Sequence, residues 1–220
     1  MVPSPENRHR YATESNCKMK PHPPASGRRG YLFRKRAFDI AFSLLLILCL
    51  ILPMLCLMLW IRIDSKGPAV FRQQRCGRNG THFTIYKFRT MHVGTPSDCA
   101  SRALQNPQKC ITRAGSILRR TSLDELPQLF NILRGDMSFV GYRPVCTTET
   151  ELNGLRSAHG VFSMRPGLTG LAQVYGRDLL SNTEKLALDL YYVEHCSLRM
   201  DFHCLWKTAT TVIRGEGLLP

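Results

Sequence analysis

The longest apolar stretch of the chain sets the strongest limit on its fold. From Ile40 to Ile61 no residue is charged, and Ser43 carries the only hydroxyl group. About 20 apolar residues cover the roughly 30 Å hydrocarbon layer of a bilayer. A buried helix of a soluble protein is shorter and has a polar stripe, which this stretch lacks. The sequence therefore predicts that the stretch lies in a membrane.

Two features bear on how this stretch enters the membrane. Pro53 lies in its middle, where it removes a backbone hydrogen bond and predicts a kink. Basic residues flank both ends, at positions 34–36 and at Arg62 and Lys66. Positive charge prefers the cytoplasmic side, which favours a re-entrant hairpin that enters and leaves by one face. Spanning helices also tolerate proline, so these residues leave a kinked span open as well.

Charge and composition indicate the partners and the domain organisation. The net charge of +14 indicates anionic partners, namely nucleic acid, phosphorylated small molecules or an anionic membrane surface. Residues 1–33 are polar, basic and rich in proline, which predicts a disordered tail. We assign residues 34–63 to the membrane and residues 64–220 to one soluble domain. The nine cysteines form no CxxC pair, which indicates a reducing compartment.

The segment after the membrane stretch has the pattern of a small soluble domain. Two runs rich in β-branched and aromatic residues surround a Gly and Asn turn in "AVFRQQRCGRNGTHFTIYKFRTM", which predicts a short β-hairpin. Helical spacing follows in "SLDELPQLFNILRG", and two more helices are predicted near the C-terminus. The predicted fold class is α+β and mainly helical, with the hairpin as its main sheet.

Two adjacent acids, Asp124 and Glu125, stand at the predicted start of a helix. Acids commonly occupy that position because they interact with the helix dipole, and Ser122 with Glu125 fits a capping box. An ionised aspartate there is also a competent nucleophile toward phosphorus and a good ligand for a hard divalent cation. The two acids alone do not distinguish a helix cap from a catalytic pair.

Arginines surround these acids in the sequence. Arg119 and Arg120 precede them by about one helical turn, and Arg134 and Arg143 follow. Guanidinium groups bind diphosphates through paired hydrogen bonds. Single exposed arginines usually only solvate a surface, and we expect two of these four to do so. The pieces "FVGYRP" and "RPGLTG" fit either phosphate-binding loops or ordinary turns.

Several motifs together resemble one known family. The pieces "KRAFDI", "YKFRTM", "SLDELPQLFNILRGDMSFVG", "RPGLTGLAQV" and "YYV" are similar to those of the bacterial sugar transferases. These are monotopic phosphoglycosyl transferases that start glycan assembly on a polyprenyl phosphate carrier. The resemblance runs from about Arg34 to the C-terminal region and leaves out the tail.

The resemblance implies a specific reaction. Members of the family move a phosphosugar from a UDP-sugar to polyprenyl (undecaprenyl) phosphate, release UMP and require Mg²⁺. By this resemblance Asp124 is the nucleophile and a metal ligand, and Glu125 assists it. Arg119 corresponds to a phosphate contact, and Arg143 to a nucleotide-sugar contact. Pro53 corresponds to the break of a re-entrant helix-break-helix.

The resemblance also implies a place in the cell and a pathway. The enzyme would lie among the inner membrane lipids of a bacterium, with its catalytic domain facing the cytoplasm. It would catalyse the first membrane step of exopolysaccharide, capsule, O-antigen or glycoprotein glycan assembly. Two residues depart from the family pattern: Tyr142 stands where "GPRP" has proline, and Tyr175 stands where "AQVNGR" has asparagine.

Two other classes of protein share part of this pattern. A non-catalytic membrane adaptor that binds anionic lipids needs the apolar stretch and the basic residues but not the two acids. A membrane-anchored nucleic-acid-binding protein would use the charge of +14. The sequence has no helix-turn-helix, zinc finger or aromatic RNA-binding motif, so no nucleic-acid partner is expected.

Overall fold

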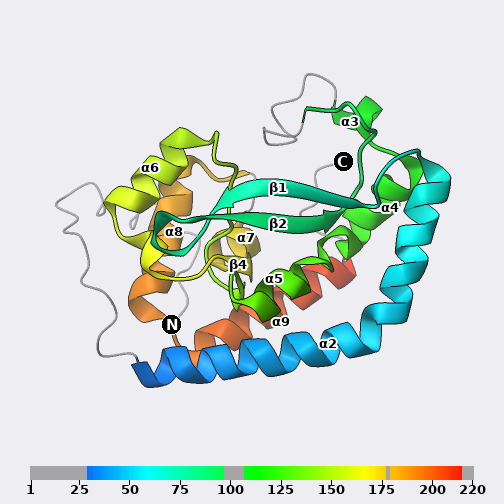
Figure 1. Cartoon of the computed structure of the whole chain (residues 1–220). Helices are drawn as coiled ribbons and strands as arrows, with labels where there is room; N and C mark the ends of the chain where they lie inside the picture. The colour runs from blue at the N-terminus through cyan, green and yellow to red at the C-terminus, as the bar shows by residue number, and fades with distance from the viewer. Residues whose placement is uncertain (1–28, 97–106, 177–178, 215–220) are drawn as a thin grey trace.

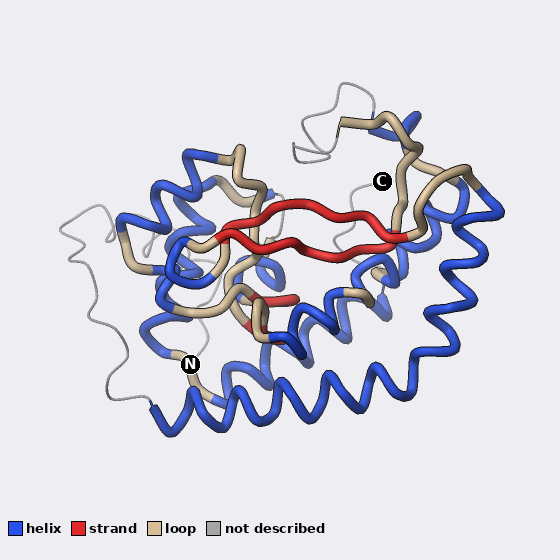
Figure 2. The backbone as a smooth tube through the Cα atoms, in the orientation of Figure 1, coloured by secondary structure: helices blue, strands red, loops and turns tan. Residues whose placement is uncertain are grey.

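The computed structural model describes residues 29–96, 107–176 and 179–214. This part of the chain is mainly helical, as predicted, with two small two-stranded sheets. Figures 1 and 2 show a long helix along one edge, with the other elements packed above it. In chain order the elements are α2 (Arg29–Asp64), β1 (Val70–Cys76), η2 (Arg78–Gly80), β2 (His82–Phe88), α3 (Pro107–Cys110), α4 (Arg113–Thr121), η4 (Leu123–Glu125), α5 (Gln128–Arg134), β3 (Ser138–Val140), α6 (Thr150–Ala158), η5 (Val161–Ser163), β4 (Gly167–Thr169), α7 (Leu171–Tyr175), α8 (Asn182–His195) and α9 (Leu198–Arg214).

Helix α2 contains the whole apolar stretch and bends part-way along its length (Figure 1). Pro53 lies inside this helix, and its missing N–H and its ring account for a bend. The helix continues through the proline, so the predicted break is a bend within one element. Helix α2 begins at Arg29 and so takes in the end of the predicted tail, while residues 1–28 lie outside the described residues.

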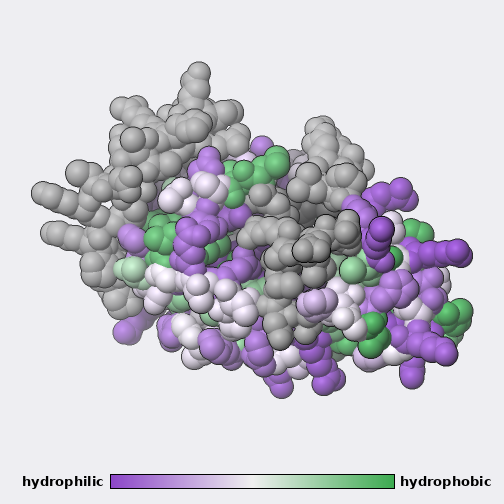
Figure 3. All heavy atoms as spheres, turned by 90° about the horizontal axis from the view of Figure 1, so that it is seen from above, coloured by the Kyte–Doolittle hydropathy of each residue, from purple (hydrophilic) through white to green (hydrophobic). Residues whose placement is uncertain are grey.

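The surface of α2 is unlike that of a helix in a soluble core. Only 17% of its apolar window is buried, and the helix is long and apolar enough to cross a membrane. Leu44, Leu48 and Leu52 are among its exposed side chains. Figure 3 views the molecule from above, the side away from the long arm of α2, and there hydrophilic side chains predominate among the described residues. The two faces of the molecule therefore suit different solvents.

The predicted hairpin is confirmed. Strands β1 and β2 pair antiparallel, from Val70 opposite Phe88 to Cys76 opposite His82. The turn contains Asn79 in the left-handed region, at φ 56°, where asparagine is better tolerated than most residues. The hairpin lies over α5 and η4 (Figure 1), and this places one face of β2 against the two acids.

A second, parallel sheet was not predicted. Strands β3 and β4 pair with Ser138 opposite Gly167. The glycine-rich pieces meet there: Gly141 N–H donates to the Thr169 carbonyl, and Gly167 N–H to the Tyr142 carbonyl. A side chain on Gly141 or Gly167 would collide with backbone of the other piece. These two N–H groups serve the fold and are therefore not available to a phosphate.

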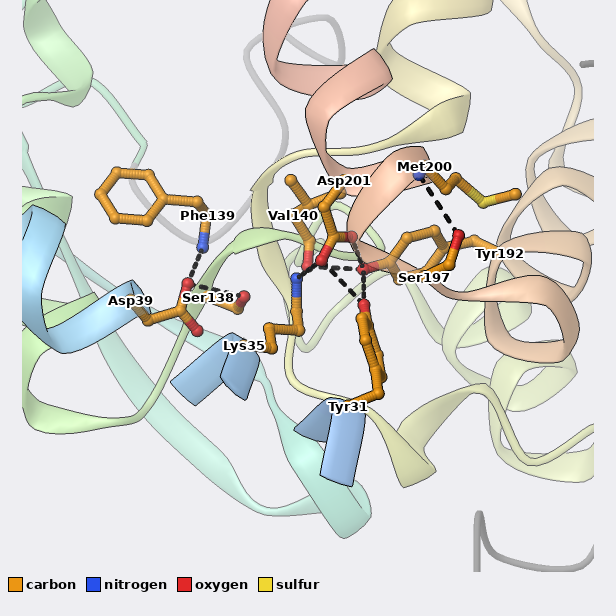
Figure 4. A network of polar contacts seen from close by, with 10 residues as sticks. All are labelled: Tyr31, Lys35, Asp39, Ser138, Phe139, Val140, Tyr192, Ser197, Met200 and Asp201. Atoms are coloured by element: carbon orange, nitrogen blue, oxygen red, sulfur yellow. Dashed lines mark hydrogen bonds and ion pairs between the residues drawn. The ribbon is translucent and has the colours of Figure 1, made fainter. Parts of the chain in front are cut away.

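A buried polar cluster joins the first turns of α2 to the rest of the domain (Figure 4). Lys35 Nζ lies 2.9 Å from Asp201 Oδ2 of α9, and both side chains are almost fully buried. Tyr31 donates to the same carboxylate oxygen at 2.8 Å, and Tyr192 of α8 donates to Oδ1 at 2.6 Å. One aspartate therefore holds three side chains from two other helices.

Two further residues of the "KRAFD" motif also hold α2 in place. Arg36 donates to the carbonyls of Ile132 and Leu133 at 2.7 and 2.8 Å, and so caps the C-terminal end of α5. Asp39 accepts hydrogen bonds from the Ser138 hydroxyl and the Phe139 N–H of β3, each at 3.1 Å (Figure 4). The motif therefore attaches α2 to α9, α5 and β3.

This cluster predicts a large effect of one substitution. Asp201→Asn leaves the Lys35 ammonium buried without its counter-ion, and breaking a buried pair in this way costs about 3–5 kcal/mol. We expect a matching fall in thermal stability of the purified chain in detergent. The control is Asn182→Ala, which removes an exposed hydrogen bond to Glu151 and should change stability by less than about 0.5 kcal/mol. Equal effects of the two substitutions would contradict the proposed importance of the cluster.

Candidate active site

The two acids lie in a tight turn between α4 and α5, not in the first turn of a regular α-helix. Helix α4 ends at Thr121, and Ser122 follows in the left-handed conformation at φ 57°, which costs roughly 1–2 kcal/mol for a residue with a Cβ. Asp124 and Glu125 then form a 3₁₀ turn, η4. Ser122 makes no capping hydrogen bond, so the capping-box interpretation is wrong.

Glu125 is held by two cations. Its Oε1 lies 3.0 Å from Lys87 Nζ and 3.1 Å from Arg143 Nη2. Although burial raises the pKa of Glu125, Lys87 and Arg143 hold it well below its usual range. Glu125 is therefore a fixed anion at the centre of the site.

Asp124 has a different environment. Its side chain is half-buried, and no ion pair or hydrogen bond to its carboxylate is found within the described part of the chain. Burial raises the pKa of Asp124, against the opposing effect of Lys87. The charge of Glu125 raises it further, and Arg119 and Arg143 lower it. A more basic carboxylate without a fixed partner is suited to attack an electrophile once it is ionised.

Arg119 reaches the site from the last turn of α4. Its Nε donates to the Thr90 hydroxyl at 2.9 Å, just beyond the end of β2. Thr90 also accepts the Thr112 N–H through its carbonyl, and a side chain at Gly115 would collide with that carbonyl. The close contact between α4 and the end of β2 therefore fixes the direction in which Arg119 points.

Arg143 follows β3 and is held through its backbone. Arg156 of α6 donates to the Arg143 carbonyl at 2.8 Å and forms a buried pair with Asp189 of α8 at 2.6 Å. Tyr142, which departs from the family pattern, packs beside Phe162. The Arg156 guanidinium lies over the Tyr142 ring, 5.0 Å from the centroid of that ring. Its ring therefore belongs to the core behind Arg143.

The structure separates the four arginines as expected. Arg119 and Arg143 lie beside the acids, whereas Arg120 and Arg134 are exposed on the surface. Tyr175, the second departure from the family pattern, stacks on His203 and donates to or accepts from its Nε2 at 3.1 Å. It therefore joins α7 to α9.

Sequence reasoning missed Lys87, which is the nearest cation to Glu125. Asn131 of α5 sets its position: the amide oxygen accepts from Tyr86 N–H at 3.0 Å, and the amide nitrogen donates to the Thr84 carbonyl at 2.8 Å. These bonds fix β2 against α5. Lys87 lies in the motif "YKFRTM". The packing of β2 against α5, which positions Lys87 beside Glu125, is not visible in the sequence.

One of the two acids fits a magnesium site whose remaining ligands come from substrate phosphates and water. Protein sites for Mg²⁺ commonly supply one or two carboxylates and leave the other positions to water and phosphate. Within the described residues no cluster of three or more His, Cys, Asp or Glu side chains offers a complete metal site. Asp124 is the residue that fits this role, because Glu125 is occupied by two cations.

A model of the bacterial sugar transferase family matches residues 30–215. The chain belongs to the bacterial sugar transferase family. It is 38% identical, over 86% of its length, to an undecaprenyl-phosphate galactose phosphotransferase of Salmonella typhimurium, of which it covers 42%. It is 40% identical, over 84% of its length, to a UDP-glucose:undecaprenyl-phosphate glucose-1-phosphate transferase of Caulobacter vibrioides, of which it covers 71%. It is also 40% identical to an exopolysaccharide production protein of Rhizobium leguminosarum, over 84% of this chain and 98% of that one.

The opposite pKa shifts of the two acids predict opposite effects on stability. A raised pKa means that the folded state loses stability as the pH rises from about 3.9, the unfolded value of aspartate, through the folded value. Asp124→Asn removes that loss, so we expect the variant to be at least as stable as the wild type at pH 7. A lowered pKa stabilises the fold above about pH 4.3, so Glu125→Gln should be less stable than the wild type at pH 7.

Thermal unfolding of both variants from about pH 3 to pH 8 measures these effects. The advantage of Asp124→Asn over the wild type should grow as the pH rises, and the deficit of Glu125→Gln should shrink as the pH falls. A loss of stability in Asp124→Asn as large as that in Glu125→Gln would show that Asp124 has a structural role.

Proposed function

We propose that this chain is a membrane phosphoglycosyl transferase that moves a phosphosugar from a UDP-sugar to a polyprenyl phosphate and releases UMP. The observation that carries the proposal is the difference between two adjacent acids. Glu125 is neutralised by Lys87 and Arg143, while Asp124 is held among cations without a direct partner in the described residues. The names of the relatives from Salmonella typhimurium and Caulobacter vibrioides support the substrate classes.

In the first step an Asp124 carboxylate oxygen attacks the phosphorus that bears the sugar. An oxygen–phosphorus bond to Asp124 forms, the bond between that phosphorus and the UMP oxygen breaks, and UMP leaves with the electron pair. Arg119 and Arg143 would neutralise the diphosphate, which otherwise repels an anionic nucleophile. Glu125 holds Arg143 and Lys87 in place for this role.

In the second step a phosphate oxygen of the polyprenyl phosphate attacks the same phosphorus. The bond to Asp124 breaks and restores the carboxylate, and polyprenyl diphosphosugar is the product. Splitting the transfer in this way lets a soluble donor and a lipid acceptor use one site in turn. When Mg²⁺ is bound, with Asp124 as its protein ligand, it would supply further neutralisation of the diphosphate.

The location of the dyad relative to the membrane belongs to the same proposal. The lipid phosphate lies at the membrane surface, so α2 would enter and leave by the cytoplasmic face of the inner membrane and bend at Pro53. Basic residues at both ends of α2 and the polar docking of its first turns support this arrangement. A membrane adaptor that binds anionic lipids would need α2 but would give no reason for an acid that stands among cations without a direct partner in the described part of the chain.

The first prediction of this proposal concerns the covalent intermediate. Incubation of the wild type with UDP-sugars in the absence of lipid should give a phosphosugar adduct and one equivalent of UMP. Asp124→Asn should give neither, because an amide is not a nucleophile for this step. Glu125→Gln should be slowed by about 10²- to 10⁴-fold but still form the adduct. Intact mass and UMP release measure both outcomes.

Screening a panel of UDP-sugars in this assay also identifies the sugar. Wild-type turnover by folded Asp124→Asn would rule out the aspartyl intermediate. Absence of UMP release with every donor, with and without undecaprenyl phosphate, would instead favour the adaptor.

The second prediction concerns the topology of α2. Single cysteines at the exposed positions Arg29 and His82, on either side of the apolar stretch, report on which face each end occupies. A membrane-impermeant maleimide should label neither Arg29→Cys nor His82→Cys in sealed spheroplasts, and both once the membrane is opened. Labelling of only one of them in sealed spheroplasts would show a true span. Native Cys76 is buried and unsuitable as a reporter, and the unsubstituted chain gives the background.

The same reporters test the role of the proline. Pro53→Leu restores a backbone hydrogen bond and should straighten α2, so one of the two cysteines should become accessible from outside the sealed membrane.

A further inference from the structure

A partly enclosed cavity of about 170 Å³ lies beside the acids. Glu125 is one of its lining residues, and the cavity walls come from α2, η4, α5, β3, β4, α7 and α9. Phe139 and Leu168 from the parallel sheet line it, together with Val174 of α7 and Thr211 of α9. The mechanism of donor cleavage described above uses none of these four side chains.

The lining of the cavity selects an apolar group. Among the described residues that line it, Glu125 is the only charged one, and no lysine or arginine takes part. A phosphate placed inside would lose its hydration without gaining a cation, which is strongly unfavourable. The cations Lys87 and Arg143 stand at Glu125, outside this lining. A ligand with a charged head and an apolar tail therefore fits with its head at the acids and its first carbons in the cavity.

The size and position of the cavity limit which apolar group of the ligand can occupy it. An apolar cavity of about 150 Å³ in another protein accommodates benzene, so the present volume suits a group of about five or six carbons. An isoprene unit has five carbons. Leu46 of α2 lines the cavity, and its neighbours Leu44, Leu45 and Leu48 are exposed on the apolar surface of that helix. The rest of a long chain can therefore follow α2 into the membrane.

We propose that this cavity binds the first isoprene unit of the polyprenyl phosphate acceptor and so places its phosphate at Asp124. This rests on the proposed function and adds the site of the acceptor to it. Occupation of the cavity is separate from donor cleavage, because the acceptor enters only in the second step. Blocking the cavity therefore impairs the second step and leaves the first intact.

Two substitutions fill the cavity from different walls, namely Thr211→Phe from α9 and Val174→Phe from α7. The matched control is Thr210→Phe, which makes the same change at the adjacent half-buried threonine of α9, outside the lining. Each buried methylene favours binding by roughly fourfold, so exclusion of two or more should raise the KM for undecaprenyl phosphate at least about tenfold. Formation of the phosphosugar adduct from the UDP-sugar in the absence of lipid should stay within about twofold of the wild type.

Each outcome of these kinetics is decisive. Unchanged acceptor KM in both cavity variants overturns the proposal. Loss of adduct formation in Thr211→Phe and Val174→Phe also overturns it, because the cavity would then serve the donor step or the position of the acids. An effect of Thr210→Phe as large as that of Thr211→Phe would assign the change to α9 in general, and would overturn it too.

A binding experiment decides the proposal without turnover. A polyprenyl phosphate with a diazirine on its first isoprene unit should crosslink to peptides of α7 or α9 in the full chain, and undecaprenyl phosphate should compete. Equal competition by phosphatidylglycerol would show a site for ordinary membrane lipid and would overturn the proposal. If the wild type releases no UMP from any UDP-sugar, the proposed function fails, while this crosslink still decides whether the cavity binds the isoprenoid.

Discussion

The ion pair between Lys35 and Asp201 is the contact on which the rest of the arrangement depends. It joins the first turns of a helix suited to lipid to the last helix of a domain suited to water. Two buried charges are stable only when both are paired and hydrogen-bonded, and the Tyr31 and Tyr192 hydroxyls meet that condition. Asp201 therefore requires α2, α8 and α9 to come together. That requirement fixes the place along α2 at which the domain packs, and so its position relative to the apolar stretch.

Polar contacts between distant segments also position the two acids. Arg36 caps the C-terminal end of α5, while the acids lie in the turn that leads into its other end. Three cations reach those acids from separate elements, and each is held by a partly buried polar contact of its own. Asn131 holds the strand of Lys87, Thr90 holds Arg119, and Arg156 holds the backbone of Arg143. The site has no single rigid loop, and its geometry depends on the packing of the whole domain.

This dependence explains which features the sequence could predict. The apolar stretch, the β1–β2 hairpin and the pair Asp124 and Glu125 are visible because each is encoded by neighbouring residues. The capping box was wrong for a tertiary reason: Lys87 and Arg143 bind Glu125 in place of the backbone N–H of Ser122. The parallel pairing of β3 with β4 joins segments far apart in the chain, and only the glycines required for their close approach hinted at it.

Strand β3 contacts α2 and also lines the cavity next to the acids. Asp39 of α2 accepts the Phe139 N–H (Figure 4). The Phe139 side chain lines the cavity beside Glu125. A shift of α2 relative to the domain would therefore move a wall of the cavity as well as the α5 cap that Arg36 provides. Because both effects begin at one short motif, the position of the membrane helix and the shape of the apolar site next to the acids are linked. The proposed acceptor site would in this way be built by the same contacts that attach the domain to α2.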